Sequence, residues 1–378
     1  MLVPVAGPGL VDALAAALDG GPAVLPVPPD AASRRRLEAV MRPDVPLEVP
    51  AALVVPTSGS TGEPKGAMLP AAALLASARS TLDRLGGPGA WLLALPTTHI
   101  AGIQVLVRSL VAGVAPVSLD LSAGFSCAAF AAFASTVDGA RRYTALVPTQ
   151  LVRLLDDGGA GLAALCSFDA VLVGGAATPP SLLDRALDAG VRVVTTYGSS
   201  ETSGGCVYDG VPLSGVSVTP DATGRLTVGG PVVFSGYRLR PDLTAVSLVD
   251  GRYVTNDLGS VVDGLVSVQG RADDVIVTGG EKVAPAAVEA ALAGHPGVRE
   301  VAVTGVPDPE WGARVVAVVV PADPASPPTL ESLRAQVSRE LGRRAAPAGL
   351  VVVDDLPRLA LGKIDRTALR RLTSRQED

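Results

Sequence analysis

Lysine is scarce in this chain of 378 residues, because only Lys65, Lys282 and Lys363 occur among 31 lysine and arginine side chains. Arginine supplies all the remaining positive charge. A surface that needs charge only for solubility can use either residue, whereas a compact ammonium suits contacts that a planar guanidinium does not. The three segments that keep a lysine are therefore candidate sites.

Cysteine and aromatic side chains are also sparse. The three cysteines, Cys127, Cys166 and Cys206, have no metal-ligand spacing, and their odd number offers no disulfide framework. This usage is typical of the reducing cytoplasm. Aromatic residues make up 3% of the chain and apolar residues 48%, so we expect aliphatic cores.

Massed positive charge and long apolar runs are missing as well. The formal net charge is −6 and the arginines are scattered, which argues against a nucleic-acid partner. The most apolar later stretch, residues 100–119, contains Gln104 and Arg108 and is predicted not to span a membrane. Residues 1–20 lack a basic start and are interrupted by proline, glycine and aspartate, so they are expected to begin a folded domain rather than form a signal peptide.

Short β-branched runs alternate with Ala/Leu-rich helical patterns up to about residue 212. Strands are expected at residues 51–55, 91–95, 143–147, 170–173 and 192–195. Helices are expected at residues 10–18, 31–41, 71–85 and 180–189. The alternation predicts an α/β fold with doubly wound sheets, in which helices cover both faces of parallel strands.

The pattern changes after residue 212. Residues 213–271 contain short alternating strands separated by glycine and aspartate, which predicts a small distorted β-barrel. Residues 272–378 return to mixed helices and strands and predict a small α+β domain. We therefore expect a large N-terminal domain, residues 1–271, and a separate C-terminal domain, residues 272–378, that carries Lys363.

A glycine- and serine-rich loop, TSGSTGEPKG at residues 57–66, lies between an apolar strand and an expected helix. Glycine lets the backbone approach a ligand closely, and the hydroxyl groups and one ammonium favour a polyphosphate. It is not a Walker A loop, because Pro64 precedes the lysine and Gly66 follows it. The alternative, a flexible linker, fits poorly between a buried strand and a helix. The predicted phosphate-binding residues are Thr57, Ser58, Gly59, Ser60, Thr61, Gly62 and Lys65.

This loop resembles the signature of the adenylate-forming enzymes, which include acyl- and aryl-CoA ligases, adenylation domains and luciferases. Those enzymes join a carboxylate to ATP, release pyrophosphate and pass the acyl-adenylate to a thiol. The resemblance implies ATP and Mg²⁺ as cofactors and CoA as co-substrate. Further motifs follow in the family's order, so the resemblance spans residues 57–366.

Two of these motifs imply the nucleotide and metal contacts. TTYGSSET (195–202) is similar to the family's aromatic-Gly-x-Thr-Glu segment, with serine in place of threonine. The resemblance implies that Tyr197 stacks on adenine, Ser200 contacts phosphate and Glu201 binds Mg²⁺. LVGGAATP (172–179) resembles the loop beside adenine and the acyl group. Neighbouring residues implied in nucleotide binding are Gly174, Gly175, Ala176, Gly198 and Ser199, and Gly174 is implied in acyl binding as well.

The ribose motifs follow. VTNDLG (254–259) resembles the family's Thr-Gly-Asp, which implies that Asp257 binds the ribose hydroxyls. Asn256 replaces the usual glycine, but asparagine tolerates the left-handed conformation. GRADD (270–274) is similar to the segment in which Arg271 binds ribose and Asp273 acts as the hinge between domains.

The C-terminal motif LPRLALGKIDR (356–366) implies that Lys363 approaches the reacting carboxylate and the α-phosphate. In the family this domain rotates after adenylation and offers another face to the thiol. Gly279 and Gly280 are then implied to line the pantetheine tunnel, although an ordinary β-turn is an equal alternative on sequence alone. Lys282 is more simply interpreted as a solvated lysine.

The nature of the acid is suggested by residues 91–113. A histidine placed like His99 closes the acyl pocket in many CoA ligases, the alternative being a structural histidine. The stretch is most similar to the o-succinylbenzoate–CoA ligases of menaquinone biosynthesis. That aromatic acid is a dianion, so its distal carboxylate needs a cation, for which Arg108 is a candidate. A structural arginine exposed on a helix is the alternative.

Other interpretations stay open. The thiol could belong to a carrier protein instead of CoA, or the chain could bind nucleotide without turnover. Against the latter, Lys65, Glu201, Asp257, Arg271 and Lys363 are all present. The phosphate loop begins only at residue 57, so part of the family's usual N-terminal scaffold is expected to be absent or supplied by a partner in a homodimer.

Overall fold

The computed structural model describes residues 1–58, 64–358 and 362–374. A four-stranded sheet with the order β1-β2-β3-β4 opens the chain. β1 and β2 run parallel, as do β2 and β3, whereas β4 returns antiparallel to β3. The elements of this part are β1 (Leu2–Val5), α1 (Leu10–Leu18), β2 (Ala23–Pro26), α2 (Ala31–Met41), β3 (Leu53–Ser58) and β4 (Pro64–Leu69).

The expected helix at residues 71–85 is confirmed as α3 (Ala71–Arg84), which begins after Pro70. The sequence did not predict the strand β4 between the phosphate loop and this helix. β4 pairs with β3 so that Thr57 lies opposite Lys65. The short apolar run of β4 has no periodicity that distinguishes strand from helix, and its pairing with β3 decides the matter. The loop therefore joins the two strands of a hairpin.

A seven-stranded sheet with the order β11-β10-β9-β8-β7-β5-β6 follows, and its five strands from β5 to β9 are parallel. The strands are β5 (Ala90–Leu93), β6 (Val117–Ser118), β7 (Arg142–Leu146), β8 (Ala170–Val173), β9 (Val193–Ser199), β10 (Gly204–Tyr208) and β11 (Val211–Pro212). The helices after α3 are α4 (Ile100–Ala112), α5 (Cys127–Ala134), α6 (Pro148–Asp157), α7 (Ala160–Cys166) and α8 (Pro180–Asp188).

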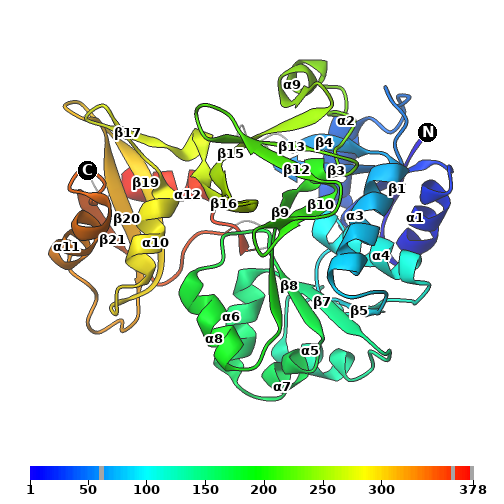
Figure 1. Ribbon diagram of the computed structural model, residues 1–378, viewed down its shortest axis with the longest axis horizontal. Coiled ribbons are helices and arrows are strands. Elements are labelled where there is room, and N and C mark those ends of the chain that lie inside the picture. The colour runs from blue at the N-terminus through cyan, green and yellow to red at the C-terminus, as the bar shows by residue number, and fades with distance from the viewer. Residues whose placement is uncertain (59–63, 359–361, 375–378) are drawn as a thin grey trace.

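Side chains of this sheet alternate between two cores. Trp91 and Leu93 pack with α1, α3 and α4, whereas Leu92 between them packs with α5 to α8. Figure 1 shows α5 to α8 gathered below β7 and β8, away from α3 and α4. Burial of both faces explains why these strands are apolar throughout. The doubly wound α/β prediction is confirmed.

Antiparallel strands form the next part. Their sheet has the order β12-β13-β15-β14, with β16 paired to β15. The elements are β12 (Ser217–Pro220), β13 (Arg225–Gly229), α9 (Pro241–Ser247), β14 (Leu248–Val249), β15 (Arg252–Val262) and β16 (Leu265–Arg271). The sequence predicted this β-rich part but not α9.

The C-terminal elements lie together on one side of the molecule (Figure 1). β19 pairs antiparallel with β20, and β21 joins β20 in parallel. The elements are β17 (Ile276–Thr278), β18 (Glu281–Val283), α10 (Pro285–Ala293), β19 (Val298–Asp308), β20 (Gly312–Pro321), α11 (Leu330–Leu341), β21 (Gly349–Val352) and α12 (Arg366–Ser374).

The hydrophobic clusters divide near the expected domain boundary. Two clusters consist of buried residues between Ile276 and Leu369. The buried members of the other clusters all precede Ser267. The residues between them carry the polar motif GRADD. The chain thus has separate hydrophobic cores before and after this segment.

The apolar stretch at residues 100–119 is mostly α4. This helix ends at Ala112, where Gly113 adopts the left-handed conformation with φ 69°. Across the described part of the chain, no helix is both long enough and apolar enough to cross a membrane.

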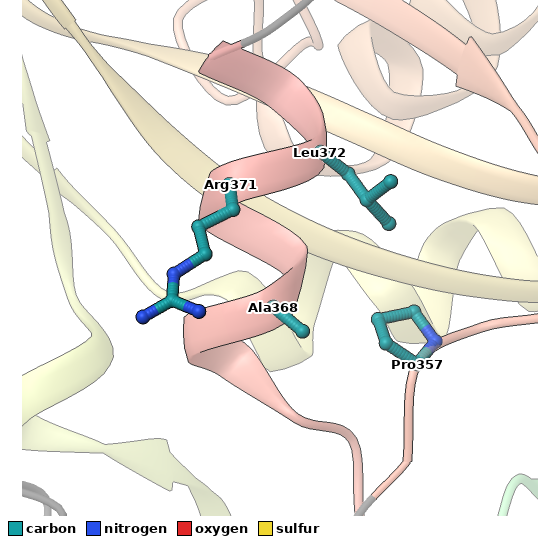
Figure 2. A pocket seen from close by; sticks show the side chains of 4 residues that line it. All are labelled: Pro357, Ala368, Arg371 and Leu372. Atoms are coloured by element: carbon teal, nitrogen blue, oxygen red, sulfur yellow. The ribbon is translucent and has the colours of Figure 1, made fainter.

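A hollow beside α12 lies outside the predicted site. Pro357, Ala368 and Leu372 face it together, and the side chain of Arg371 extends away from them (Figure 2). None of these four residues belongs to the predicted site residues.

Candidate active site

A sharp turn between β9 and β10 presents Glu201. The 3-10 turn Ser200–Thr202 begins where β9 ends, and the backbone then reverses through Ser203 (φ 53°) and Gly204 (φ 98°). The Thr202 hydroxyl accepts the backbone N–H of Ser199 at 2.8 Å. Glu201 is 6% exposed. The carboxylate is thus fixed at the carboxyl end of a parallel strand, where ligands of α/β proteins usually bind.

Tyr237 connects Glu201 to the phosphate-loop hairpin. Its hydroxyl donates to Glu201 Oε1 at 2.7 Å, and Lys65 Nζ lies 5.0 Å from the centroid of its ring. The backbone N–H of Phe234 donates to the Glu201 carbonyl at 2.9 Å. Burial and then the Glu201 carboxylate raise the pKa of Tyr237, so the phenol stays protonated and remains a donor.

Asp257 lies on β15 between an aromatic and a cationic side chain. Tyr197 donates its hydroxyl to Asp257 Oδ2 at 2.8 Å, and Arg271 Nη1 lies 3.5 Å from Asp257 Oδ1. Burial raises the pKa of Asp257, although Tyr197 and Arg271 act in the opposite direction. Arg271 also holds Asp273 at 2.9 and 2.8 Å. The predicted ribose and hinge residues are therefore in direct contact.

Lys363 joins this group from the C-terminal part of the chain. The charges that act on its ammonium are those of Arg271, Asp257 and Glu201. The side chain remains accessible to solvent, but the surrounding protein desolvates it, so burial first and Arg271 second lower its pKa. The structure thus brings the lysine to the two acidic residues of the N-terminal part.

Gly362, the residue before Lys363, contacts both the C-terminal and the N-terminal part of the chain. Arg358 donates to the carbonyl of Gly362 at 2.8 Å and is paired with Glu300. Gly362 has φ 72°, and a Cβ there would lie 2.5 Å from Thr149 Oγ1 at the start of α6. This position therefore requires glycine both for its conformation and for the close approach of the two parts.

His99 precedes the first residue of α4 and is partly buried. Burial lowers its pKa, and the positive charge of Lys363 lowers it further. The imidazole is thus held near the same charged group and favoured in its neutral form.

Arg108 is not an exposed helix arginine, so that alternative is wrong. It is 3% exposed, its guanidinium carbon lies 5.1 Å from the centroid of the Trp91 ring, and Nη2 donates to Tyr208 Oη at 3.3 Å. No described contact joins it to Glu201 or Lys363. It lies farther along α4, two and a half turns after His99 by the usual helical repeat of about 3.6 residues.

Other predicted nucleotide residues lie at the ends of β3, β8 and β9. Gly174 follows β8 and approaches β9 so closely that a Cβ would lie 2.1 Å from Thr196 Oγ1. Gly198 is equally crowded, because a Cβ there would lie 2.1 Å from the Gly204 carbonyl oxygen. Thr57 and Ser58 end β3, and Gly175 and Ala176 are exposed beyond β8. Gly59, Ser60, Thr61 and Gly62 lie outside the described residues.

Gly279 and Gly280 form the two-residue turn between β17 and β18, with φ of 54° and 81°. Such positive φ values suit a tight hairpin, and the two glycines therefore form a β-turn. Gly279 also packs closely under the Trp311 ring, because a Cβ would lie 2.8 Å from Cε3. Lys282 is exposed on β18, in agreement with a solvated lysine.

The metal-binding prediction is compatible with the donor set. Among the residues that the structure describes, no group of three or more His, Cys, Asp and Glu side chains could hold a metal by itself. Mg²⁺ is commonly held by one or two carboxylates together with substrate phosphates and water. Glu201 fits this mode, and the buried Ser199 Oγ nearby has no partner within the described ranges.

Sequence reasoning missed Tyr237, Tyr208 and Gln104. Each makes a hydrogen bond to a residue more than 30 positions away, and no local motif marks any of them. The one local signal is Gly236, directly before Tyr237, because a glycine permits close approach of another backbone segment. In the structure the Met68 N–H donates to the Gly236 carbonyl.

Comparison with known proteins agrees with the motifs. Residues 15–232 match the family model described as AMP-binding enzyme, and residues 287–363 match its C-terminal domain. A probable 2-succinylbenzoate–CoA ligase of Mycobacterium tuberculosis (strain H37Rv) is 50% identical and covers 98% of this chain and 96% of that protein.

Two solved structures of o-succinylbenzoate CoA synthetase from Bacillus subtilis are similar. One, in complex with the acyl-adenylate intermediate, has a TM-score of 0.72 at 29% identity, covering 85% of this chain and 69% of that one. The other, in complex with ATP and magnesium ion, has a TM-score of 0.71 at 29% identity, covering 85% and 70%. The chain belongs to the AMP-binding enzyme family, the adenylate-forming enzymes that its motifs resemble.

Proposed function

We propose that this chain is an ATP-dependent 2-succinylbenzoate–CoA ligase that forms an acyl-adenylate and then transfers the acyl group to CoA, releasing pyrophosphate and AMP. The similarity over nearly the full length of a relative with that name supports the substrate. The observation that carries the proposal is that Lys363, from the C-terminal part of the chain, lies near enough to Glu201 and Asp257 for their charges to act on its ammonium. A chain that only bound nucleotide would not need this lysine there.

The first half-reaction requires two anions to meet. Lys363 neutralises the attacking carboxylate and the oxygens of the α-phosphate, and Lys65 with the phosphate loop holds the departing pyrophosphate. Glu201 would hold Mg²⁺, which when bound would withdraw negative charge from the phosphates. Tyr237 keeps the Glu201 carboxylate in place through its 2.7 Å hydrogen bond.

The nucleotide lies along the ends of β8 and β9 and beside the middle of β15. Tyr197 and the glycines after β8 enclose adenine, while Ser199 and Ser200 face the phosphates. Asp257 and Arg271 bind the ribose hydroxyls. Their mutual contact supports this role, because both already project from adjacent positions of the β15–β16 pair.

The acid binds along α4. His99 closes the acyl pocket beside the reacting carboxylate, and Arg108 provides the charge for the second carboxylate. The guanidinium of Arg108 is buried without an acidic partner in the described residues, which supports this assignment, because burying a cation is unfavourable unless an anion accompanies it.

The domain boundary at residues 271/272 serves the second half-reaction. We propose that the C-terminal domain turns about Asp273, withdraws Lys363 and brings Gly279 and Gly280 to the thiol arm of CoA. The separate hydrophobic clusters on either side support this division. We also propose that the enzyme acts in the cytoplasm, which its three free cysteines support. Association as a homodimer is a further part of the proposal.

The test is release of AMP and pyrophosphate from ATP with a panel of carboxylic acids, with and without CoA. Turnover with 2-succinylbenzoate and CoA is the expected result. Adenylation of another acid would retain the mechanism and refute the substrate. A requirement for a carrier protein in place of CoA would refute the acceptor.

A further inference from the structure

The region around Arg108 contains a chain of hydrogen bonds whose direction is fixed. The hydroxyl of Thr81 donates its single hydrogen to the Ser77 carbonyl at 2.8 Å. Thr81 Oγ1 lies 2.9 Å from Tyr208 Oη, so the hydrogen of that contact must come from the tyrosine. Tyr208 Oη then accepts from Arg108 Nη2 at 3.3 Å. The phenol lone pairs are therefore directed at the guanidinium.

This contact is important because Arg108 has few others. Within the described ranges, the bond to Tyr208 is its one hydrogen bond, its Nε is buried without a partner, and no acidic side chain pairs with it. The Trp91 ring covers the guanidinium but does not fix its rotation, since a cation–π contact has no preferred partner atom. Among the described contacts, the hydrogen bond to Tyr208 is therefore the one that engages a specific N–H group of the guanidinium.

Both elements that carry this pair begin at the candidate active site. α4 follows His99, and β10 follows the Glu201 turn. They run alongside each other, because a Cβ at Gly204 would lie 3.1 Å from the Gln104 side chain, one helical turn before Arg108. The Arg108–Tyr208 pair thus lies farther along the two elements whose first residues adjoin His99 and Glu201.

We propose that Tyr208 is a specificity-determining positioning residue, which holds the Arg108 guanidinium so that an acid with a second carboxylate is selected over one without it. This inference rests on the proposed function. Tyr208 touches Arg108 and not the substrate. A guanidinium that loses its one fixed hydrogen bond can turn between several orientations, and ordering it again opposes binding of the second carboxylate.

The test compares 2-succinylbenzoate with 4-oxo-4-phenylbutanoate, which has the same chain and ring but no ring carboxylate. Pyrophosphate release is measured for the wild type and Tyr208→Phe. We expect the variant to raise KM for 2-succinylbenzoate on the order of tenfold, the loss of one hydrogen bond to a charged group. KM for 4-oxo-4-phenylbutanoate and for ATP should not change.

Tyr143→Phe is the matched control. Tyr143 is equally buried, packs on the same Trp91 ring and donates its hydroxyl to the Leu85 and Gly87 carbonyls rather than contacting Arg108. This variant should keep the wild-type preference between the two acids. A general loosening of the core would alter both variants alike.

A second pair of variants keeps the test decisive if Tyr208→Phe does not fold. Thr81→Val removes the acceptor that directs the tyrosine and should lower the preference for the dicarboxylate on the order of threefold, a neutral hydrogen bond being weaker. Thr81→Ser keeps the hydroxyl acceptor and should retain the wild-type preference for the dicarboxylate. Equal changes for both acids, or none, would overturn the inference while leaving the proposed function intact. If the wild type adenylates neither acid, the proposed function falls and the inference falls with it.

Discussion

Replacing Lys363 by methionine removes the ammonium and keeps most of the apolar stem. In the structure the charges of Asp257 and Glu201 both act on this ammonium. Loss of one preorganised charged donor costs on the order of 10²–10³ in rate, or about 3–4 kcal/mol of transition-state stabilisation. We expect that loss in formation of the acyl-adenylate, because there the lysine faces the reacting carboxylate.

The assay measures the two half-reactions separately. Pyrophosphate release reports adenylation, and consumption of preformed acyl-adenylate by CoA reports thiol transfer. The lysine should matter little in the second, since rotation of the C-terminal domain removes it. Lys282→Met is the matched control, because Lys282 is an exposed lysine of the same domain, and it should leave adenylation unchanged.

Dependence on pH gives an independent check of the same role. Burial and Arg271 lower the pKa of Lys363, so its protonated fraction falls at a lower pH than that of an ordinary lysine. Wild-type adenylation should therefore decline on the alkaline side, and Lys363→Met should lack this decline. Equal losses in both half-reactions, or an unchanged alkaline limb in the variant, would refute the reasoning.

Three further results are expected. In Lys363→Met, the pKa of His99, measured by NMR titration, should rise because a repelling positive charge is gone. It should stay below its ordinary value because the imidazole remains buried. An unchanged pKa of His99 would show that Lys363 does not lie near it in solution. Tyr237→Phe keeps the aromatic ring beside Lys65 but loses the hydrogen bond to Glu201. The Mg²⁺ concentration that gives half-maximal ATP binding should therefore rise several-fold. Arg238→Met should lower the free energy of unfolding by about 3–5 kcal/mol in urea titrations, since the buried guanidinium binds four backbone carbonyls and a carboxylate, and a change under about 1 kcal/mol would contradict that.

Several features followed from local sequence. Four strands of the central sheet and the helices at residues 10–18, 31–41, 71–85 and 180–189 were predicted because their apolar patterns act over a few positions. The structure adds a capping contact at the start of α2, where Asp30 accepts the Ser33 N–H. The glycine loop, the Glu201 turn and the Lys363 segment were recognised because each is a contiguous motif. The doubly wound α/β architecture was predicted for the same reason.

Tertiary structure decided the rest. No local pattern distinguishes β4 from the start of a helix, and only its pairing with β3 does so. Arg108 was expected as either a ligand or an exposed arginine, yet packing against Trp91 buries it. Tyr208 and Tyr237 were not predicted, because their roles arise from partners 100 and 36 positions away. Motifs determine which groups the chain carries, whereas the direction and partner of each buried hydrogen bond depend on strands and helices that meet only when the chain is folded.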